Sequence, residues 1–295
     1  MAIEAAGRPF PLPLAARPRA RPPALGGRLL RGHLARVGLV VLLTLLVMAA
    51  FAPSLAPHDP TEQRLDRMLS PPGSGHALGT DDLGRDVLSR LIYGARVSLL
   101  VGVLSVGISL LIGVSLGLVA GYRGGLVDEV VMRVMDGLLA FPALVLALAI
   151  TAALGPNLRH AMIAIGIVGI PGFARLVRGQ VLSVRAQEFV EAARAAGLGD
   201  GRIIVRHIAP SVLAPIIVHA SLRVAFAVLA EAGLSFLGLG VQPPTPSWGA
   251  MLNAGREYLE MAPWLSVAPG AAIFITTLSF NFLGDGLRDA LEPRL

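Results

Sequence analysis

Long stretches without a charged side chain are the feature of this sequence that most restricts its fold. Because the hydrocarbon core of a bilayer is about 30 Å thick, an α-helix needs about 20 apolar residues to cross it. The stretch 161–174 reaches that length if Arg159 and Arg175 extend toward the two interfaces, and 208–230 reaches it if Arg223 is tolerated within the membrane. Four stretches reach it unaided: 37–56, 97–122, 137–158 and 261–284. We therefore predict an all-α membrane protein with six transmembrane helices.

The composition excludes several other classes of protein. Hydrophobic residues make up 54% of the 295 residues and charged residues only 15%, too little polar surface for a soluble globule and too much apolar surface for a disordered chain. There is no cysteine and no lysine. Without cysteine, disulfides and thiolate metal sites are impossible. Without lysine, the chain cannot encode a phosphate-binding loop of the usual type, so any ATP that drives it is hydrolysed by a partner.

The arginines predict the orientation in the membrane. If the N-terminus is cytoplasmic, seventeen arginines lie in inside segments and seven in outside segments, with Arg223 within a span. This bias predicts that both termini are cytoplasmic. The net charge of +6 does not indicate a nucleic-acid partner, because the basic residues flank the spans instead of lining one face.

Three regions follow from this pattern. Residues 1–36, rich in proline, arginine and alanine, are predicted to be a disordered cytoplasmic tail. Residues 37–94 hold the first transmembrane helix and a polar extracytoplasmic segment. Residues 95–291 form the transmembrane core, with a polar cytoplasmic loop at 183–210.

That cytoplasmic loop has the pattern of a helix, a turn and a second short helix. Residues 187–196 favour a helix, Gly197 is a typical C-cap, and 202–210 favour the second helix. Small side chains on the first helix would let another protein approach closely, and its glutamates would pair with arginines of that partner. The residues concerned are Glu188, Glu191, Ala192, Ala193 and Ala196. The alternative is an ordinary solvated loop whose charges only keep it out of the bilayer.

The residues Glu191-Ala192-Ala193, then Gly197 and finally Pro210, resemble the EAA loop of binding-protein-dependent ABC importer permeases of the type I fold. In that family the loop is the coupling helix that docks into a groove on the cytoplasmic ATPase. The usual ending I-x-L-P is replaced here by His207-Ile208-Ala209-Pro210. A histidine at position 207 is similar to the pattern of the dipeptide/oligopeptide/nickel branch of that family.

Further segments resemble the C-type subunits of that branch, so that the likeness covers about residues 34–294. They are 78–86, 136–142, 230–249 and 281–289. The resemblance implies a permease subunit in a bacterial-type plasma (inner) membrane, where it forms half of a translocation pathway for di- or oligopeptides or a similar small solute. The alternative is the same role for nickel or another non-peptide solute. The resemblance also implies a second homologous permease, two cytoplasmic ABC ATPases and an extracytoplasmic solute-binding protein as partners, with no cofactor and no catalysis by this chain.

The motif from Gly113 to Gly117 matches G-x-S-x-G, which surrounds the nucleophile of many hydrolases. Here it lies in an apolar stretch without a nearby base. Gly113, Gly117 and Gly121 are spaced four apart, which is typical of closely packed membrane helices. We therefore predict packing, with a membrane-embedded serine hydrolase centred on Ser115 as the rival; a passive channel, which needs no docking loop, is a third hypothesis.

Charged residues within a membrane are costly and are usually functional. Arg223 and Glu231 are therefore candidate pathway or gate residues, although a direct pair is not required by their spacing. Arg223 either faces the pathway, where it would meet a peptide carboxylate, or lies at the cytoplasmic side and pairs with lipid or a partner. We favour the second interpretation.

The remaining histidines and aromatic residues carry less information. No two of the six histidines share a metal-ligand spacing with a carboxylate on one helix face, so no metal site is predicted. Trp248, Tyr258 and Trp264 flank the last outer loop and fit an interfacial aromatic belt.

Overall fold

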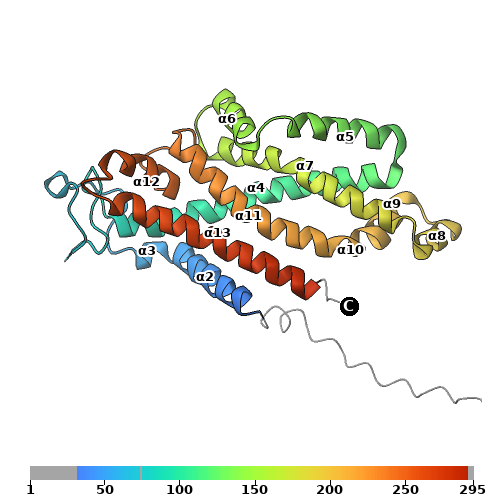
Figure 1. The fold of residues 1–295 in the computed structure, drawn as a ribbon, viewed down its shortest axis with the longest axis horizontal. Coiled ribbons are helices and arrows are strands. Elements are labelled where there is room, and N and C mark those ends of the chain that lie inside the picture. Colours follow the sequence, from blue (N-terminus) through green and yellow to red (C-terminus); the bar gives the residue numbers. More distant parts are fainter. Residues whose placement is uncertain (1–31, 74, 292–295) are drawn as a thin grey trace, which may run out of the picture.

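The computed structural model describes residues 32–73 and 75–291 and arranges them as a bundle of long helices (Figure 1). Over these residues the β-type contacts are two isolated bridges, Gly73–His76 and Thr80–Asp86, so the all-α prediction is confirmed. The elements are α2 (His33–Ala50), α3 (Ala52–Leu55), η1 (Leu65–Arg67), α4 (Val87–Arg123), α5 (Gly125–Leu139), α6 (Ala143–Leu154), α7 (Leu158–Val184), α8 (Glu188–Ala195), α9 (Asp200–Ile203), η2 (Ile204–Ile208), α10 (Ala209–Ser211), α11 (Leu213–Phe236), α12 (Trp248–Gly255), η3 (Arg256–Tyr258) and α13 (Trp264–Leu291).

Five of these helices are long and apolar enough to cross a membrane, and the count rises to six if the bent pair α5 and α6 forms one span. The five are α2, α4, α7, α11 and α13. The six expected spans are therefore present, but the third is not a continuous helix.

The break in the third span lies at Pro142, where α5 and α6 meet at 89°. Proline has no N–H to donate and its ring disfavours helical backbone at the preceding residue, here Phe141. Pro142 itself has extended backbone, with φ −55° and ψ 129°. The uncharged stretch 137–158 correctly indicates an apolar region, but its expected reading as one straight helix is wrong.

Other helices differ from the expected ranges in length. The second span, α4, begins at Val87, ten residues before the uncharged stretch at 97–122, because Arg90 is accommodated by donating a 2.9 Å hydrogen bond to the carbonyl of Pro60. The expected boundary at 94/95 therefore falls inside a helix. The first helix begins at His33, and the rest of the expected disordered tail, residues 1–31, lies outside the described residues.

Helix α4 packs closely against α7 through glycines at four-residue spacing. A Cβ at Gly113 would lie 2.7 Å from the carbonyl oxygen of Ile170, and one at Gly117 would lie 2.6 Å from that of Ala174. The Ser115 hydroxyl is exposed and donates to the carbonyl of Leu111 at 2.7 Å. The packing interpretation of this motif is confirmed, and Ser115 lacks the geometry of an activated nucleophile.

This contact allows a matched pair of substitutions. We expect Gly117→Ala to destabilise the fold by about 1–3 kcal/mol, because the added methyl group overpacks the interface. Gly107 lies on the same helix with no atom within 4 Å of its Cβ direction, so Gly107→Ala is expected to be neutral or slightly stabilising. Thermal unfolding of the two variants in detergent measures the difference; equal melting temperatures would contradict the packing account.

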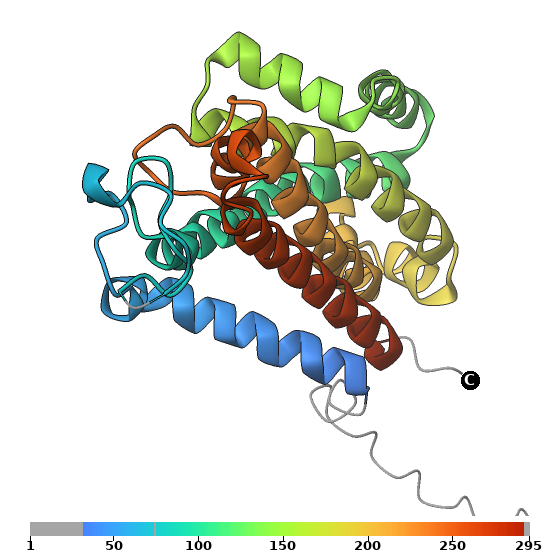
Figure 2. The same ribbon diagram turned by 60° about the vertical axis from the view of Figure 1, so that its left-hand side comes forward.

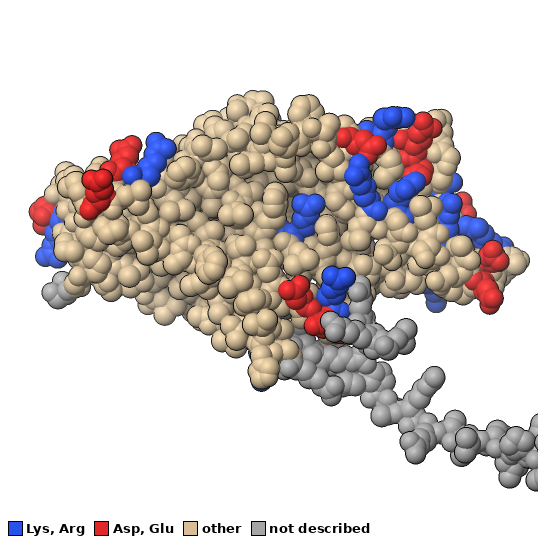
Figure 3. All heavy atoms as spheres, in the orientation of Figure 1, with Lys and Arg blue, Asp and Glu red and all other residues tan. Residues whose placement is uncertain are grey.

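The two ends of the bundle differ. The segment 57–86 and α12 lie at one end, while α8, the start of α2 and the end of α13 lie toward the other (Figures 1 and 2). On the face drawn in Figure 3, charged side chains are most frequent toward the two ends, and broad uncharged areas with a few charged side chains lie between them. This arrangement fits a bundle that crosses a bilayer and exposes both ends to water.

Candidate functional site

The segment between α7 and α11 projects from one end of the bundle and is the main candidate site (Figure 1). We call residues 188–210 the protrusion. It contains α8, α9, the π-helical turn η2 and the start of α10. The expected first short helix is confirmed, whereas the expected second helix begins earlier, at Asp200, and is divided into short pieces.

The first turn of α8 carries Glu188 and Glu191, both exposed. Negative charges are favourable there because the first peptide N–H groups of a helix are unpaired and point toward them. The same side chains remain free to meet an external cation, since no ion pair involves them within the described residues.

Gly197 ends this helix as predicted. Its φ is +76°, a left-handed backbone that favours glycine. The N–H of Gly197 donates to the carbonyl of Arg194 at 2.9 Å, and that of Leu198 donates to Ala193 at 3.2 Å. The turn directs the chain back toward the membrane and exposes α8.

The small residues of α8 do not all face outward. Ala192 is exposed, but Ala193 is only 5% exposed and lies on the inner face with Val190, which is 0% exposed. Residues three apart share a helix face, whereas neighbours are about 100° apart. The expectation that Ala193 offers itself to a partner is therefore wrong; it helps seat α8 on the bundle. Further along, His207 is half-buried and Pro210 is exposed.

The protrusion is fastened to the end of α4. The Tyr122 hydroxyl donates a 2.8 Å hydrogen bond to Asp200, and the Arg194 guanidinium lies 5.2 Å from the centre of the Tyr122 ring. Arg185, just before the protrusion, donates to the carbonyl of Gly121 at 2.8 Å. The protrusion and the residue that follows α7 are thus attached to the end of α4.

Two exposed apolar residues of the protrusion were missed by the sequence analysis. Phe189 is 42% exposed and Val205 is 70% exposed, although both lie outside the spanning helices. Large apolar side chains displayed beside charges are typical of protein-binding surfaces. The signal in the sequence is an apolar residue between Glu188 and Glu191.

The two ionisable residues of α11 lie apart. Arg223 is half-buried, and its Nε donates to His219 at 3.2 Å. Glu231 is 0% exposed and accepts a 2.6 Å hydrogen bond from Ser235, whose hydroxyl in turn accepts from the N–H of Val241. No ion pair joins Arg223 and Glu231 in the described chain, consistent with their spacing.

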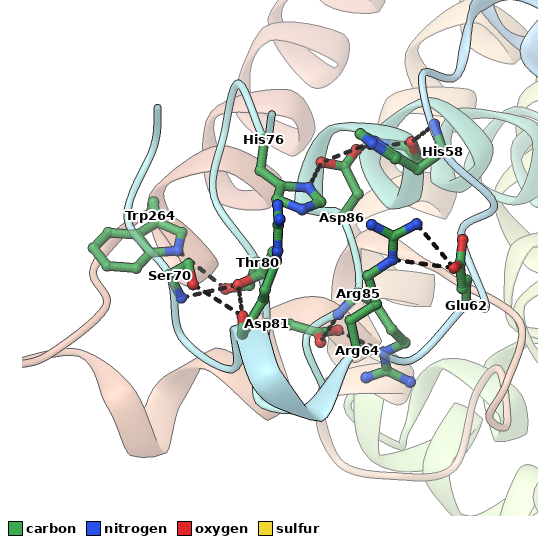
Figure 4. A network of polar contacts seen from close by, with 12 residues as sticks. His58, Glu62, Arg64, Ser70, His76, Thr80, Asp81, Arg85, Asp86 and Trp264 are labelled. Atoms are coloured by element: carbon green, nitrogen blue, oxygen red, sulfur yellow. Dashed lines mark hydrogen bonds and ion pairs between the residues drawn. The ribbon is translucent and has the colours of Figure 1, made fainter. Parts of the chain in front are cut away.

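The two tryptophans are built into the outer end. Trp248 is 0% exposed and its indole N–H donates to the carbonyl of Leu91 at 2.9 Å. Trp264 donates to the carbonyl of Thr80 at 3.3 Å (Figure 4). The expected interfacial belt is therefore wrong for Trp248, which joins α12 to α4 as a core residue.

A polar cluster lies beside the start of α4 at this end (Figure 4). Asp86 accepts hydrogen bonds from the N–H and hydroxyl of Ser89, both at 2.7 Å, and contacts His76 at 2.8 Å. His58 lies 3.7 Å from the same carboxylate. The sequence analysis did not bring these histidines together, because the contact depends on how the long connection between α3 and α4 folds back on itself. The ligand atoms of His58, His76 and Asp86 lie within 4.8 Å of one another, so these residues have the spacing to hold a metal ion.

The cluster predicts a dependence on acid pH. Burial opposes ionisation of Asp86, but the hydrogen bonds from His76 and Ser89 and the nearby His58 together hold its pKa below the ordinary value. The stabilisation is complete above the unfolded pKa of about 4 and is lost as the pH falls through the lower folded pKa. We expect the protection of amides 86–90 against hydrogen exchange, relative to the intrinsic rate at each pH, to fall below about pH 4 in the wild type and to be low already at neutral pH in Asp86→Ala. Identical protection in both proteins at pH 7 would contradict this.

The amino-acid sequence matches two families of membrane transport proteins. Residues 113–295 match the family described as binding-protein-dependent transport system inner membrane component. The chain belongs to this family. Residues 27–72 also match the N-terminal transmembrane domain of oligopeptide transport permease C. The chain is therefore a multi-pass inner membrane permease subunit and not an enzyme, as its sequence predicts.

Individual relatives of this permease match along most of their length. The dipeptide transport system permease protein DppC of Alkalihalophilus pseudofirmus is 48% identical, with 91% of this chain and 88% of that protein covered. The di/tripeptide permease DppC of Pseudomonas aeruginosa is 49% identical over 88% and 87%. The glutathione permease GsiD of Pectobacterium atrosepticum is 45% identical over 91% and 89%.

A solved structure confirms the type I importer fold of the permease. The inward-facing MetNI methionine ABC transporter contains a chain that superposes with a TM-score of 0.57 at 18% identity. The superposition covers 69% of this permease and 97% of that chain. The likeness therefore extends over nearly the whole of the solved chain.

Proposed function

We propose that this chain forms half of the translocation pathway of an ATP-driven importer for di- or oligopeptides. A second homologous permease completes the pathway, two cytoplasmic ATPases grip the protrusion, and an extracytoplasmic binding protein delivers the peptide. This chain needs no cofactor of its own. Relatives named for dipeptide, di/tripeptide and glutathione transport support the peptide class.

The observation that carries this proposal is the two-sided construction of the protrusion. It exposes Glu188, Phe189 and Glu191 to the surroundings, while Asp200 and Arg194 attach it to α4 through Tyr122. A surface that is free outside and rigidly attached inside suits the transmission of movement. A bound ATPase shifts the permease between two states only by the difference in its affinity for them, so the protrusion must fit the closed ATPases better in one state.

The protrusion also supports the proposed orientation. ATPases that use cytoplasmic ATP require it to face the cytoplasm. The start of α2 and the end of α13 lie toward the same end of the bundle (Figure 1), so both termini are assigned to the cytoplasm. The segment 57–86 and α12 then face the binding protein.

Glu231 is proposed as part of the outer gate. Its carboxyl group binds Ser235, and Ser235 binds the N–H of Val241 in the segment that leads to α12. This chain of hydrogen bonds ties the outer end of α11 to the external segment. Movement of α11 would therefore displace the surface that receives the binding protein.

The test is uptake by the complete transporter in proteoliposomes, with the binding protein outside and ATP inside. We expect a labelled dipeptide to accumulate only when ATP and binding protein are both present. Entry of the dipeptide without ATP, only up to its external concentration, would identify a passive channel. ATP-driven uptake of nickel, with no uptake of peptide, would replace the peptide substrate by a non-peptide solute.

A further inference from the structure

A cationic side chain lies near the middle of a spanning helix without an acidic partner. Arg223 is the eleventh residue of the 24-residue helix α11, so it lies about 15 Å along the helix axis from the start. No carboxylate in the described part of the chain lies within 4.0 Å of it. Glu231 is two turns further along. An unpaired cation at this depth is costly, which marks it as a functional candidate.

The surroundings of Arg223 hold its guanidinium without neutralising it. Its Nε donates to His219 Nε2 at 3.2 Å, so the histidine acts as a neutral acceptor. The guanidinium lies 5.7 Å from the centre of the Phe226 ring. It also packs against α7 at Gly172, where a Cβ would clash with it. One of five N–H donors is used on His219, and the positive charge remains available to an anion.

Phe226 connects Arg223 with an apolar cavity that Arg223 itself does not line. Phe226 contacts the guanidinium and also lines a cavity of about 630 Å³ formed by α6, α11, α12 and α13. Leu229, Phe236 and Phe274 line the same cavity. Sites for small ligands are usually apolar and contain a few polar groups that fix orientation. An apolar space with a cation at its side fits a molecule that has apolar side chains and one carboxylate.

We propose that Arg223, oriented by His219, binds the C-terminal carboxylate of the peptide as it passes through the pathway. This inference rests on the proposed peptide import. The planar guanidinium presents paired N–H groups that match a carboxylate, and the low-dielectric surroundings strengthen the contact. His219 and Gly172 are positioning residues: one accepts from the Nε, and the other leaves room for the guanidinium against α7.

The test compares a dipeptide with the same dipeptide amidated at its C-terminus, using uptake by the complete transporter in proteoliposomes. Arg223→Gln is expected to reduce kcat/KM for the free dipeptide about tenfold or more, without changing uptake of the amide. Arg223→Lys is expected to recover part of the loss, because it keeps the charge but not the fork. The same binding protein is used throughout, so its own preference cancels in the ratio between variants.

Arg159→Gln is the control. Arg159 is exposed in the first turn of α7, an element that does not line the cavity. It is expected to leave the ratio of the two peptides unchanged. An equal loss for free and amidated dipeptide in Arg223→Gln, or no loss, would overturn the inference. Loss of the second permease from the purified complex would show instead that Arg223 pairs with that subunit. If the wild type takes up neither peptide, the proposed function itself fails.

Discussion

Replacing Glu191 by arginine is expected to release the ATPases from the permease and to lower ATP-driven uptake about thirtyfold or more. Glu191 is exposed in the first turn of α8, on the surface of the protrusion. Reversal of a charge at the centre of a docking surface leaves the partner's cation facing another cation. Such central contacts are worth about 2 kcal/mol or more, which corresponds to about thirtyfold in affinity.

The measurement is co-purification of the ATPase subunits with tagged permease, together with uptake. Glu260→Arg is the control, because Glu260 is also exposed but lies at the opposite end, between η3 and α13. It is expected to retain the ATPases fully. Normal ATPase recovery and uptake in Glu191→Arg would show that this surface is not the docking site.

The second large effect is expected from substitution of Tyr122, which should impair uptake without releasing the ATPases. Tyr122→Ala removes the hydrogen bond to Asp200 and the ring under Arg194, while the outer side of the protrusion is unchanged. A hydrogen bond to a charged group contributes about 1.5–3 kcal/mol, and a cation–π contact adds about 0.5–1 kcal/mol. We therefore expect the ATPases to remain bound while uptake falls about tenfold or more.

Tyr122→Phe separates the two contributions, because it removes only the hydroxyl. It is expected to lose less uptake than Tyr122→Ala and to keep the buried ring in place. The readout is the number of peptides transported per ATP hydrolysed. A parallel loss of ATPase binding and uptake in Tyr122→Ala would mean that this residue supports docking itself, and an unchanged ratio would mean that α4 does not transmit the movement.

The sequence analysis predicted best what depends on local composition. Uncharged stretches located every spanning region, and Gly197 was identified as the end of α8 because only a residue tolerant of positive φ suits that turn. Uncharged stretches show where the chain is apolar, but they do not show whether a helix is continuous or where it begins. The sequence analysis therefore missed the break at Pro142 and the helical residues of α4 that precede Val97.

Contacts between distant segments were the other limit. Trp248 looks like an interfacial aromatic residue until α4 provides the carbonyl of Leu91 and closes over it. His58, His76 and Asp86 meet only because the segment 57–86 folds back on itself beside the start of α4. The burial of Ala193 depends on which face of α8 packs against the bundle, and the composition of α8 does not determine that face.

The most direct test of the central proposal is a crosslink from the protrusion to an ATPase subunit. The chain has no cysteine, so Ala192→Cys, on the exposed side of α8, gives a unique attachment point without removing a native thiol. In the complete, transporting complex we predict that a short thiol crosslinker joins position 192 to an ATPase subunit and that the linked complex no longer transports. Free labelling of position 192 by a bulky maleimide, with full transport and no crosslink, would contradict the account.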